Sequence, residues 1–202
     1  MTPLLDWREH SAADSVVPAM NERVPYQVTR AALAYDALAP LPVVLLLDNI
    51  RSMYNVGAFF RTADAAGLRH LYLAGITAHP PKSAISKTAL GAEDTVPWEH
   101  HWDPVPLLEN LRAQGHETAA VETDPCALDL FDWAPRFPVC VVFGHEVEGV
   151  RRELSARCDT HIRIPMLGRK HSLNVATAGG VVIYELLRKY RCLHGALTAE
   201  MR

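Results

Sequence analysis

Long apolar runs are missing from this chain of 202 residues. No stretch reaches the roughly 18 consecutive apolar residues of a transmembrane helix, so the sequence predicts no membrane span. The N-terminus carries Asp6, Arg8, Glu9 and Asp14 and therefore lacks the apolar core of a signal peptide. Together these absences favour a cytoplasmic protein without a membrane partner.

Cysteine is scarce as well. The four cysteines are scattered along the chain and form no Cys-x-x-Cys pair. This pattern favours reduced thiols over a disulfide framework or a zinc site. The ten histidines, including His145 and the pair His100-His101, show no His-x-x-x-His spacing. We therefore expect structural or exposed histidines and no metal cofactor.

Three widespread motifs of catalytic loops are also absent. The sequence has no Gly-x-Ser-x-Gly, which disfavours a serine hydrolase. It has no Gly-x-x-x-x-Gly-Lys-Ser/Thr, and no Gly-x-Gly-x-x-Gly follows the first predicted strand. The last absence disfavours a nucleotide-dependent reductase of ordinary doubly wound topology.

The net charge of −3 is distributed unevenly. Residues 42–91 carry five basic and two acidic side chains, and residues 161–202 carry seven and two. Residues 92–160 carry five basic and fourteen acidic side chains. A local basic face attracts phosphate even when the sum is negative, but a chance imbalance on solvated faces gives the same composition.

The length suits one domain preceded by a short arm. Residues 1–41 form a predicted N-terminal helical extension, with an Ala-rich helix at 28–38 that ends before Pro40 and Pro42. We expect this extension to pack on the core, a partner subunit or a substrate. Residues 42–202 form the main domain.

Strand and helix patterns alternate through the main domain. The apolar run at 42–48 predicts a strand buried on both faces. Val56, Phe59, Phe60 and Ala63 predict a helix that ends at a left-handed Gly67. Further strands are predicted at 68–74, 116–121, 137–143 and 161–164, and further helices at 83–90, 104–114, 150–157 and 173–190. This order predicts an α/β fold, with a mostly parallel sheet and helices on both faces.

Three polar loops follow predicted strands, where open α/β sheets bind ligands. In the first, we expect Asn55 to be a helix N-cap and Gly57 to allow a close approach to the first turn. Arg61 lies off the apolar stripe, and we expect loops above the sheet to cover it in part. Its guanidinium suits a phosphate or a developing oxyanion, but an ordinary surface Arg has the same pattern.

The second loop follows the predicted strand at 137–143. Gly144 allows a sharp turn with exposed amides, and we expect Gly149 to open the next helix. The ordinary alternative for Glu146 and Glu148, between these glycines, is that both are solvated turn carboxylates.

The third loop leads from Ile164 to a helix start, where Ser172 and Asn174 flank Leu173. N-capping is the ordinary explanation for such side chains beside free amides. Gly179 and Gly180 follow in the same helix, at a cost of about 2 kcal/mol relative to alanine. We therefore expect a partner helix, a threaded segment or a ligand to approach this backbone closely.

The loops carry three motifs in a fixed order: Asn55-x-Gly57-x-x-x-Arg61-Thr-Ala-x-x-x-Gly67, Phe143-Gly144-x-Glu146-x-x-Gly149 and Ile164-Pro165-Met166-x-Gly168-x-x-x-Ser172-Leu173-Asn174-Val175. Together they closely resemble the SpoU family of SPOUT-class RNA ribose 2′-O-methyltransferases, over residues 42–192. The resemblance implies a SPOUT methyltransferase domain at 42–202 with a C-terminal trefoil knot. It also implies a homodimer that acts on tRNA or rRNA with S-adenosylmethionine and releases S-adenosylhomocysteine.

The resemblance assigns catalytic roles to five polar residues. Arg61 resembles the family's catalytic arginine, which helps to deprotonate the ribose 2′-hydroxyl, and Asn55 orients that arginine or the ribose. Glu146, Ser172 and Asn174 match the remaining polar site residues, with Asn174 holding Arg61 or the knot loop in place.

The resemblance also implies where the cofactor binds. Gly144, Ile164 and Leu173 match its contacts, made mainly through backbone groups, and Met166 and the strand-end Thr123 are further candidates. A catalytically silent RNA-binding protein on the same fold is the alternative, and the intact polar residues argue against it. The sequence identifies neither the RNA nor the nucleotide.

Overall fold

The computed structural model of the chain describes residues 39–194. The predicted extension of residues 1–41 lies outside the described residues except for its last three, of which Leu41 begins the first strand. The elements are β1 (Leu41–Asp48), α2 (Met53–Ala66), β2 (Leu68–Ala74), α3 (Ser83–Ala89), the 3₁₀ helix η1 (Ala92–Asp94), β3 (Trp98–His101), α4 (Pro104–Ala113), β4 (Glu117–Val121), β5 (Leu128–Asp129), β6 (Val139–Phe143), α5 (Arg152–Ser155), β7 (Thr160–Arg163) and α6 (Val175–His194).

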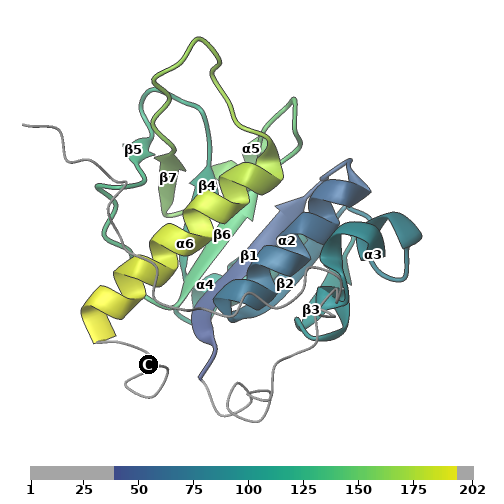
Figure 1. Cartoon of the computed structure of the whole chain (residues 1–202). Helices are drawn as coiled ribbons and strands as arrows, with labels where there is room; N and C mark the ends of the chain where they lie inside the picture. Colours follow the sequence, from purple (N-terminus) through teal and green to yellow (C-terminus); the bar gives the residue numbers. More distant parts are fainter. Residues whose placement is uncertain (1–38, 195–202) are drawn as a thin grey trace, which may run out of the picture. The chain divides into compact units, whose positions relative to one another are not determined.

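Seven strands form one sheet in the order β3-β2-β1-β6-β4-β7-β5 (Figure 1). Each of its six pairings is parallel, which confirms the predicted α/β architecture. β1 pairs with β2 on one side and β6 on the other, and every residue of β1 except Pro42 is buried. Its continuous apolar run is therefore that of a strand covered on both faces.

Helices cover both faces of the sheet. Val43, Leu45 and Leu47 of β1 belong to the core on the side of α2, α3 and α6. Val44 and Leu46 belong to the core on the opposite side, where α4 and α5 pack. Figure 1 shows α2 and α6 lying side by side in front of the sheet and α4 behind it. Within residues 39–194, no helix combines the length and the apolar character that crossing a membrane requires.

The close approach expected at the paired glycines of α6 comes from a partner helix. A Cβ added to Gly179 would overlap the ring of Phe59 on α2, whereas one added to Gly180 would meet no atom within 4 Å. The absence of a side chain is therefore required at Gly179 and not at Gly180. Gly57 has the same function on the other side of α2, where a Cβ would overlap Ile85 and Thr88 of α3.

Several predicted boundaries are wrong. The sequence pattern did not predict β3 and β5, because each is a short edge strand without an apolar run. The helix predicted from residue 150 begins at Arg152, since Gly149 has a φ of 75° and closes the preceding turn. The last helix begins at Val175 rather than 173 because Asn174 is its cap.

Candidate functional site

Glu146 connects the loop after β6 to the start of α2. Its Oε2 accepts a hydrogen bond from the amide of Arg51 at 3.1 Å. Its Oε1 accepts from the amide of Ser52 at 3.2 Å and from Nδ2 of Asn55 at 3.0 Å. The carboxylate thus binds donors at a helix N-terminus, where a negative charge is favourable. The alternative of a merely solvated turn carboxylate is wrong for this residue.

These donors determine the ionisation of Glu146. Burial alone would raise the pKa of its carboxyl group, but the hydrogen bonds from Arg51, Asn55 and Ser52 outweigh that effect. The pKa of Glu146 is therefore lower than that of an ordinary glutamate. The carboxylate is a fixed acceptor in this site and not a proton donor at neutral pH.

Asn55 and Asn174 extend the same hydrogen-bonded set. Asn55 is not the N-cap of α2: Ser52 is, and its Oγ accepts from the amide of Asn55 at 3.4 Å. The cap position moves because the helix begins at Met53. Oδ1 of Asn55 accepts from Nδ2 of Asn174 at 3.1 Å. Glu146, Asn55 and Asn174, one from each of the three motif loops, therefore lie in one network.

Asn174 also begins α6. Its Oδ1 accepts from the amides of Ala176 at 3.0 Å and Thr177 at 3.2 Å, which is the geometry of an N-cap. Asn174 is therefore both the N-cap of α6 and a member of the network with Asn55. Its Oδ1 accepts from the amides of α6, and its Nδ2 donates to Asn55.

Gly144 is buried by the turn that follows it. A Cβ at this position would overlap the backbone of Gly149 and Val150, so any side chain would displace the turn. The amide of Gly149 donates to the carbonyl of His145 at 2.9 Å, which closes the turn. The sequence predicted a sharp turn at Gly144, and the exposed residues of this turn are 146–148.

Nδ1 of His145 accepts from the amides of Val147 and Glu148, each at 3.2 Å. His145 therefore has a structural role in the turn. Among residues 39–194, no three His, Cys, Asp or Glu side chains are grouped as metal ligands.

Arg61 and Ser172 are both exposed. Arg61 lies six positions beyond Asn55 on α2, a rise of about 9 Å along the helix axis. Ser172 lies two residues before the cap of α6, in a loop whose residues 167–174 are all exposed.

Three of the five predicted cofactor residues lie at neighbouring strand ends. Thr123 follows β4, Gly144 follows β6 and Ile164 follows β7, and these strands are adjacent in the sheet. Thr123 and Leu173 are exposed, whereas Ile164 and Met166 are half-buried. The sheet order thus places loops that are distant in sequence at one edge.

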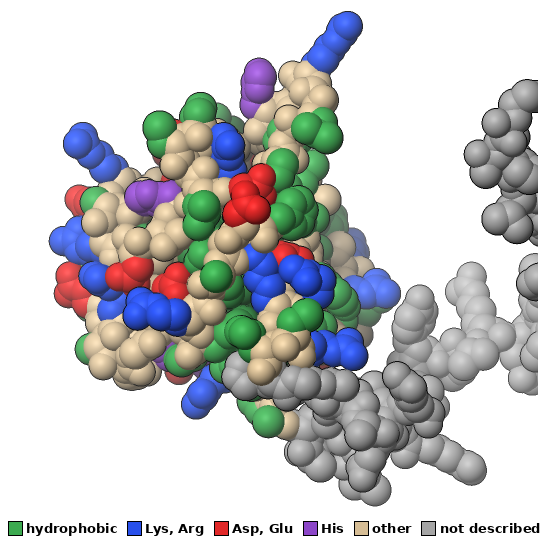
Figure 2. Space-filling model, turned by 90° about the vertical axis from the view of Figure 1, so that its left-hand side faces the viewer, with side chains coloured by type: hydrophobic (Ala, Val, Ile, Leu, Met, Phe, Trp, Pro, Cys, Tyr) green, Lys and Arg blue, Asp and Glu red, His purple; other side chains and the backbone are tan. Residues whose placement is uncertain are grey.

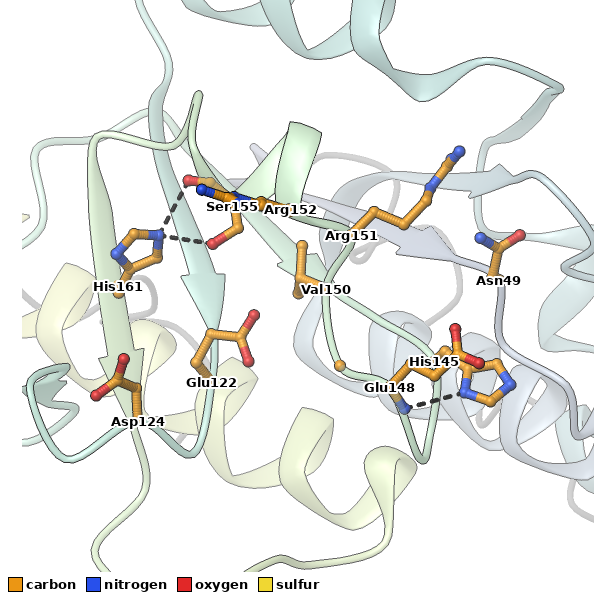
Figure 3. A pocket seen from close by; sticks show the side chains of 11 residues that line it. Asn49, Glu122, Asp124, His145, Glu148, Val150, Arg151, Arg152, Ser155 and His161 are labelled. Carbon is orange, nitrogen blue, oxygen red and sulfur yellow. Dashed lines mark hydrogen bonds between the residues drawn. The ribbon is translucent and has the colours of Figure 1, made fainter.

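A pocket of about 540 Å³ lies at this edge (Figure 3). Its lining comes from the ends of β1, β4 and β6, from α5 and from β7, and most of the residues are polar: Asn49, Glu122, Asp124, His145, Glu148, Gly149, Val150, Arg151, Arg152, Ser155 and His161. None of the five predicted cofactor residues is among them. The loops that carry Gly144 and Thr123 nevertheless contribute to the pocket, through His145, Glu148 and Gly149 and through Glu122 and Asp124.

Two acidic residues near this pocket were missed by the motif analysis. Burial raises the pKa of Glu122 above its ordinary value, more than a hydrogen bond from the backbone of Val150 lowers it. Asp48, buried at the end of β1, accepts from Nε and Nη2 of Arg151 at 2.7 and 2.6 Å. The sequence did contain a signal for both residues, namely an acidic residue at the end of an apolar run. Asp48 is the last residue of the buried strand β1, and Glu122 directly follows the buried strand β4.

The Asp48–Arg151 pair holds the chain that leaves the Glu146 turn. Its bidentate geometry is the strong form of an ion pair, and the Asp48 carboxylate raises the pKa of Arg151. The pair therefore fixes the far end of the loop that carries Glu146 to the end of β1.

Basic side chains are paired with carboxylates to different extents in the acidic segment, residues 92–160, and in the two segments on either side of it. Arg112, Arg136, Arg151 and Arg157 of the acidic segment each pair with a carboxylate. Seven exposed cations of the other segments have no ion pair within residues 39–194: Arg51, Arg69, Lys82, Lys87, Arg169, Lys170 and Arg191. Figure 2 shows one face, on which basic and acidic side chains are interspersed. The available positive charge is thus concentrated in the two segments that carry the first and third polar loops.

The motif loops and the sheet agree with one known family, whose model, the SpoU rRNA Methylase family, matches residues 42–184. The chain belongs to this family. The resemblance inferred from the three motifs is therefore confirmed.

SpoU relatives are similar to this chain in both sequence and structure. The 23S rRNA (guanosine-2'-O-)-methyltransferase RlmB of Ralstonia nicotianae is 33% identical over 154 residues, which cover 76% of this chain and 61% of the relative. A crystal structure of the A. aeolicus TrmH/SpoU tRNA modifying enzyme matches with a TM-score of 0.69 and 27% identity, over 78% of this chain and 79% of that one.

The AdoMet-bound rRNA methyltransferase of Sinorhizobium meliloti matches with a TM-score of 0.68 and 28% identity, over 75% of this chain and 60% of that one. The chain spans about three fifths of the length of the curated SpoU relatives that it matches.

Proposed function

We propose that this SpoU protein transfers a methyl group from S-adenosylmethionine to a ribose 2′-hydroxyl of tRNA or rRNA. The observation that carries the proposal is the network of Glu146, Asn55 and Asn174, which joins the three motif loops at the carboxyl edge of the sheet. The names of the relatives include both rRNA and tRNA enzymes. S-adenosylhomocysteine is the expected product.

The residues at the adjacent ends of β4, β6 and β7 fit the cofactor. Neighbouring strands lie about 4.8 Å apart, so Thr123, Gly144 and Ile164 are within reach of one elongated ligand. Half-buried Met166 and exposed Leu173 offer apolar surface beside them. When bound, S-adenosylmethionine supplies an activated methyl group, so acid catalysis at the donor is not required.

The protein must align the ribose oxygen and stabilise the charge that develops on it. We assign charge stabilisation to Arg61, because a guanidinium cation donates several hydrogen bonds in a fixed planar arrangement and is a poor base. We assign orientation of the ribose to Asn55 and the exposed Ser172. Glu146 and Asn174 hold Asn55 in place through the contacts described above.

The sheet order supports the trefoil knot. β7 lies between β4 and β5, although β4 and β5 are consecutive in the chain. Lys189 of α6 donates to the carbonyls of Leu130, Phe131 and Trp133 in the connection that follows β5. The last helix of the chain thus lies against that connection, which is the neighbourhood that a threaded C-terminal segment would have.

Exposed apolar side chains support a homodimer. Leu167 is fully exposed and Leu173 partly so in the third motif loop, and Tyr184 and Leu193 are exposed on α6. A second copy of the chain that covers this surface would also enclose the motif loops. All four cysteines are free thiols, which suits a cytoplasmic protein.

A calorimetric titration tests the cofactor assignment. We expect S-adenosylmethionine or S-adenosylhomocysteine to bind with micromolar affinity and NAD not to bind. Binding of NAD without binding of S-adenosylmethionine would show that the proposed activity is wrong.

The alternative, a catalytically silent RNA-binding protein, is tested at Arg61. Arg61→Ala should abolish transfer of radiolabelled methyl groups to bulk RNA and leave cofactor affinity nearly unchanged. Arg69→Ala, which removes another exposed arginine from β2, is the matched control and should retain activity. Full activity in Arg61→Ala would remove the catalytic assignment, and an inactive wild type that binds RNA would favour the silent protein.

A further inference from the structure

A group of rings lies at the same edge of the sheet as the site, beyond β2. Trp102, directly after β3, is 79% exposed, and Ile76, in the loop after β2, is 65% exposed. The rings of His100 and Trp102 are 5.0 Å apart and nearly perpendicular, at 85°. His79 lies 4.9 Å from His100 and stacks on Trp98 at 5.8 Å. We call Ile76, His79, Trp98, His100 and Trp102 together the aromatic platform.

The platform is held in place by hydrogen bonds between β3 and the loop after β2. Nε2 of His100 lies 3.1 Å from the carbonyl of Gly75. The amide of Gly75 donates to the carbonyl of His101 at 3.0 Å. Trp102 therefore directly follows a hydrogen-bonded stretch of backbone, and its exposed ring contacts the ring of His100.

The loop after β2 also connects the platform to the site. The amide of Ile76 donates to Oδ1 of Asn49 at 3.0 Å. Oγ1 of Thr77 accepts from the amide of Ile50 and donates to the carbonyl of Leu47, each at 2.9 Å. Arg51 directly follows Ile50 in the chain, and its amide donates a hydrogen bond to Glu146. The platform and the Glu146 network are thus parts of one hydrogen-bonded rim.

The spacing along this rim suits a nucleic-acid strand. β1 and β3 are separated by two strand spacings, or about 10 Å. A stacked strand advances about 3.4 Å per nucleotide, so about three nucleotides cover that distance. Exposed cations without an ion pair among the described residues lie at both ends: Arg51 beside the site, and Lys82 three residues after His79.

We propose that the aromatic platform binds an unpaired base of the RNA substrate, which stacks on Trp102 while a nucleotide about three positions away along the strand occupies the methylation site. The inference rests on the proposed function. Exposed aromatic rings beside cations are the recognition surface for single-stranded RNA, because each base has a face that stacks and the cations hold the phosphates. An apolar partner protein would not make use of these cations.

The test is equilibrium binding of the full chain to fluorescein-labelled single-stranded oligoadenylate of about 12 nucleotides, with an RNA duplex of equal length as comparison. Trp102→Ala should weaken binding of the single strand by about fivefold or more and leave duplex affinity nearly unchanged. Trp102→Phe, which keeps a stacking face, should retain most of the affinity. Phe131→Ala is the matched control: Phe131 is 56% exposed next to β5, at the opposite edge of the sheet, and its loss should change neither affinity.

Cofactor affinity and methyl transfer are measured on the same proteins, so the two proposals fail separately. Unchanged binding of the single strand by Trp102→Ala overturns the platform, even when the wild type transfers methyl groups. An equal loss in Trp102→Ala and Phe131→Ala also overturns it. A changed oligomeric state of Trp102→Ala in sedimentation, without a change in RNA affinity, would show that this surface contacts another protein chain instead. A wild type that binds the oligonucleotide through Trp102 but transfers no methyl group would overturn the proposed function alone.

Discussion

Asn174 donates a hydrogen bond from Nδ2 to Oδ1 of Asn55 over 3.1 Å, although 119 positions separate them in the chain. The other end of each side-chain amide binds a different partner. Oδ1 of Asn174 caps α6, and Nδ2 of Asn55 donates to Glu146. The start of α2, the start of α6 and the turn after β6 are therefore mechanically coupled through two asparagines.

A double-mutant cycle measures this coupling. Asn55→Ala and Asn174→Ala should each lower the free energy of unfolding in urea. Their combined effect should depart from the sum by about 0.5–3 kcal/mol, because the two residues share a hydrogen bond. Asn55→Ala combined with Asn110→Ala, on exposed α4 surface, is the control and should be additive. Additivity in both pairs would contradict the contact.

The Glu146 carboxylate should make stability depend on pH. The pKa of Glu146 is lowered in the folded protein, so its ionised form stabilises the fold above the ordinary glutamate range. This contribution is lost as pH falls through the lowered pKa. Glu146→Gln should therefore be less stable than the wild type at pH 7, with the difference vanishing in acid.

Chemical denaturation across a pH series measures that difference. Glu148→Gln, at an exposed residue of the same turn, should show little difference from the wild type at any pH. A Glu146→Gln deficit that is constant with pH would mean that the charge is not its cause.

The two glycines of α6 should respond in opposite ways to alanine. In Gly179→Ala the new methyl group would overlap Phe59, and overpacking of this kind costs about 1–3 kcal/mol. In Gly180→Ala the methyl group meets no atom within 4 Å, so helix propensity should add up to about 1 kcal/mol. Thermal unfolding followed by circular dichroism distinguishes them. A loss of stability in Gly180→Ala would indicate a second close partner, such as another subunit.

Glu122 should destabilise the protein at neutral pH. Burial raises its pKa, so the folded state binds the proton more tightly than the unfolded state. The resulting penalty grows as pH rises from the ordinary glutamate range through the raised pKa. Glu122→Gln should therefore be more stable than the wild type at pH 7 and equally stable in acid.

The same denaturation series, with exposed Asp132→Asn as control, checks the Glu122 effect. If Glu122→Gln were instead less stable at pH 7, the acceptance of a hydrogen bond from Val150 would outweigh the burial of the charge.

The sequence by itself determined the fold class and the family. Continuous apolar runs identify parallel strands buried on both faces, and the runs at β1 and β2 agree with the structure to within one residue. Motif order and spacing were enough to indicate the SpoU family, since they describe local turns and helix starts. The short edge strands β3 and β5 were not predicted, because few of their residues contact the core and their sequences therefore show no apolar pattern.

Only the tertiary structure decided which polar residues are partners. Asn55 is of a residue type that favours the N-cap, yet Ser52 is the N-cap of α2. Asn55 instead forms hydrogen bonds with both Glu146 and Asn174. The Asp48–Arg151 pair and the contact between the rings of His79 and His100 likewise join segments that are separate in sequence. The physical reason is that local patterns encode burial and backbone conformation, whereas the order of strands in the sheet determines which side chains come within hydrogen-bonding distance.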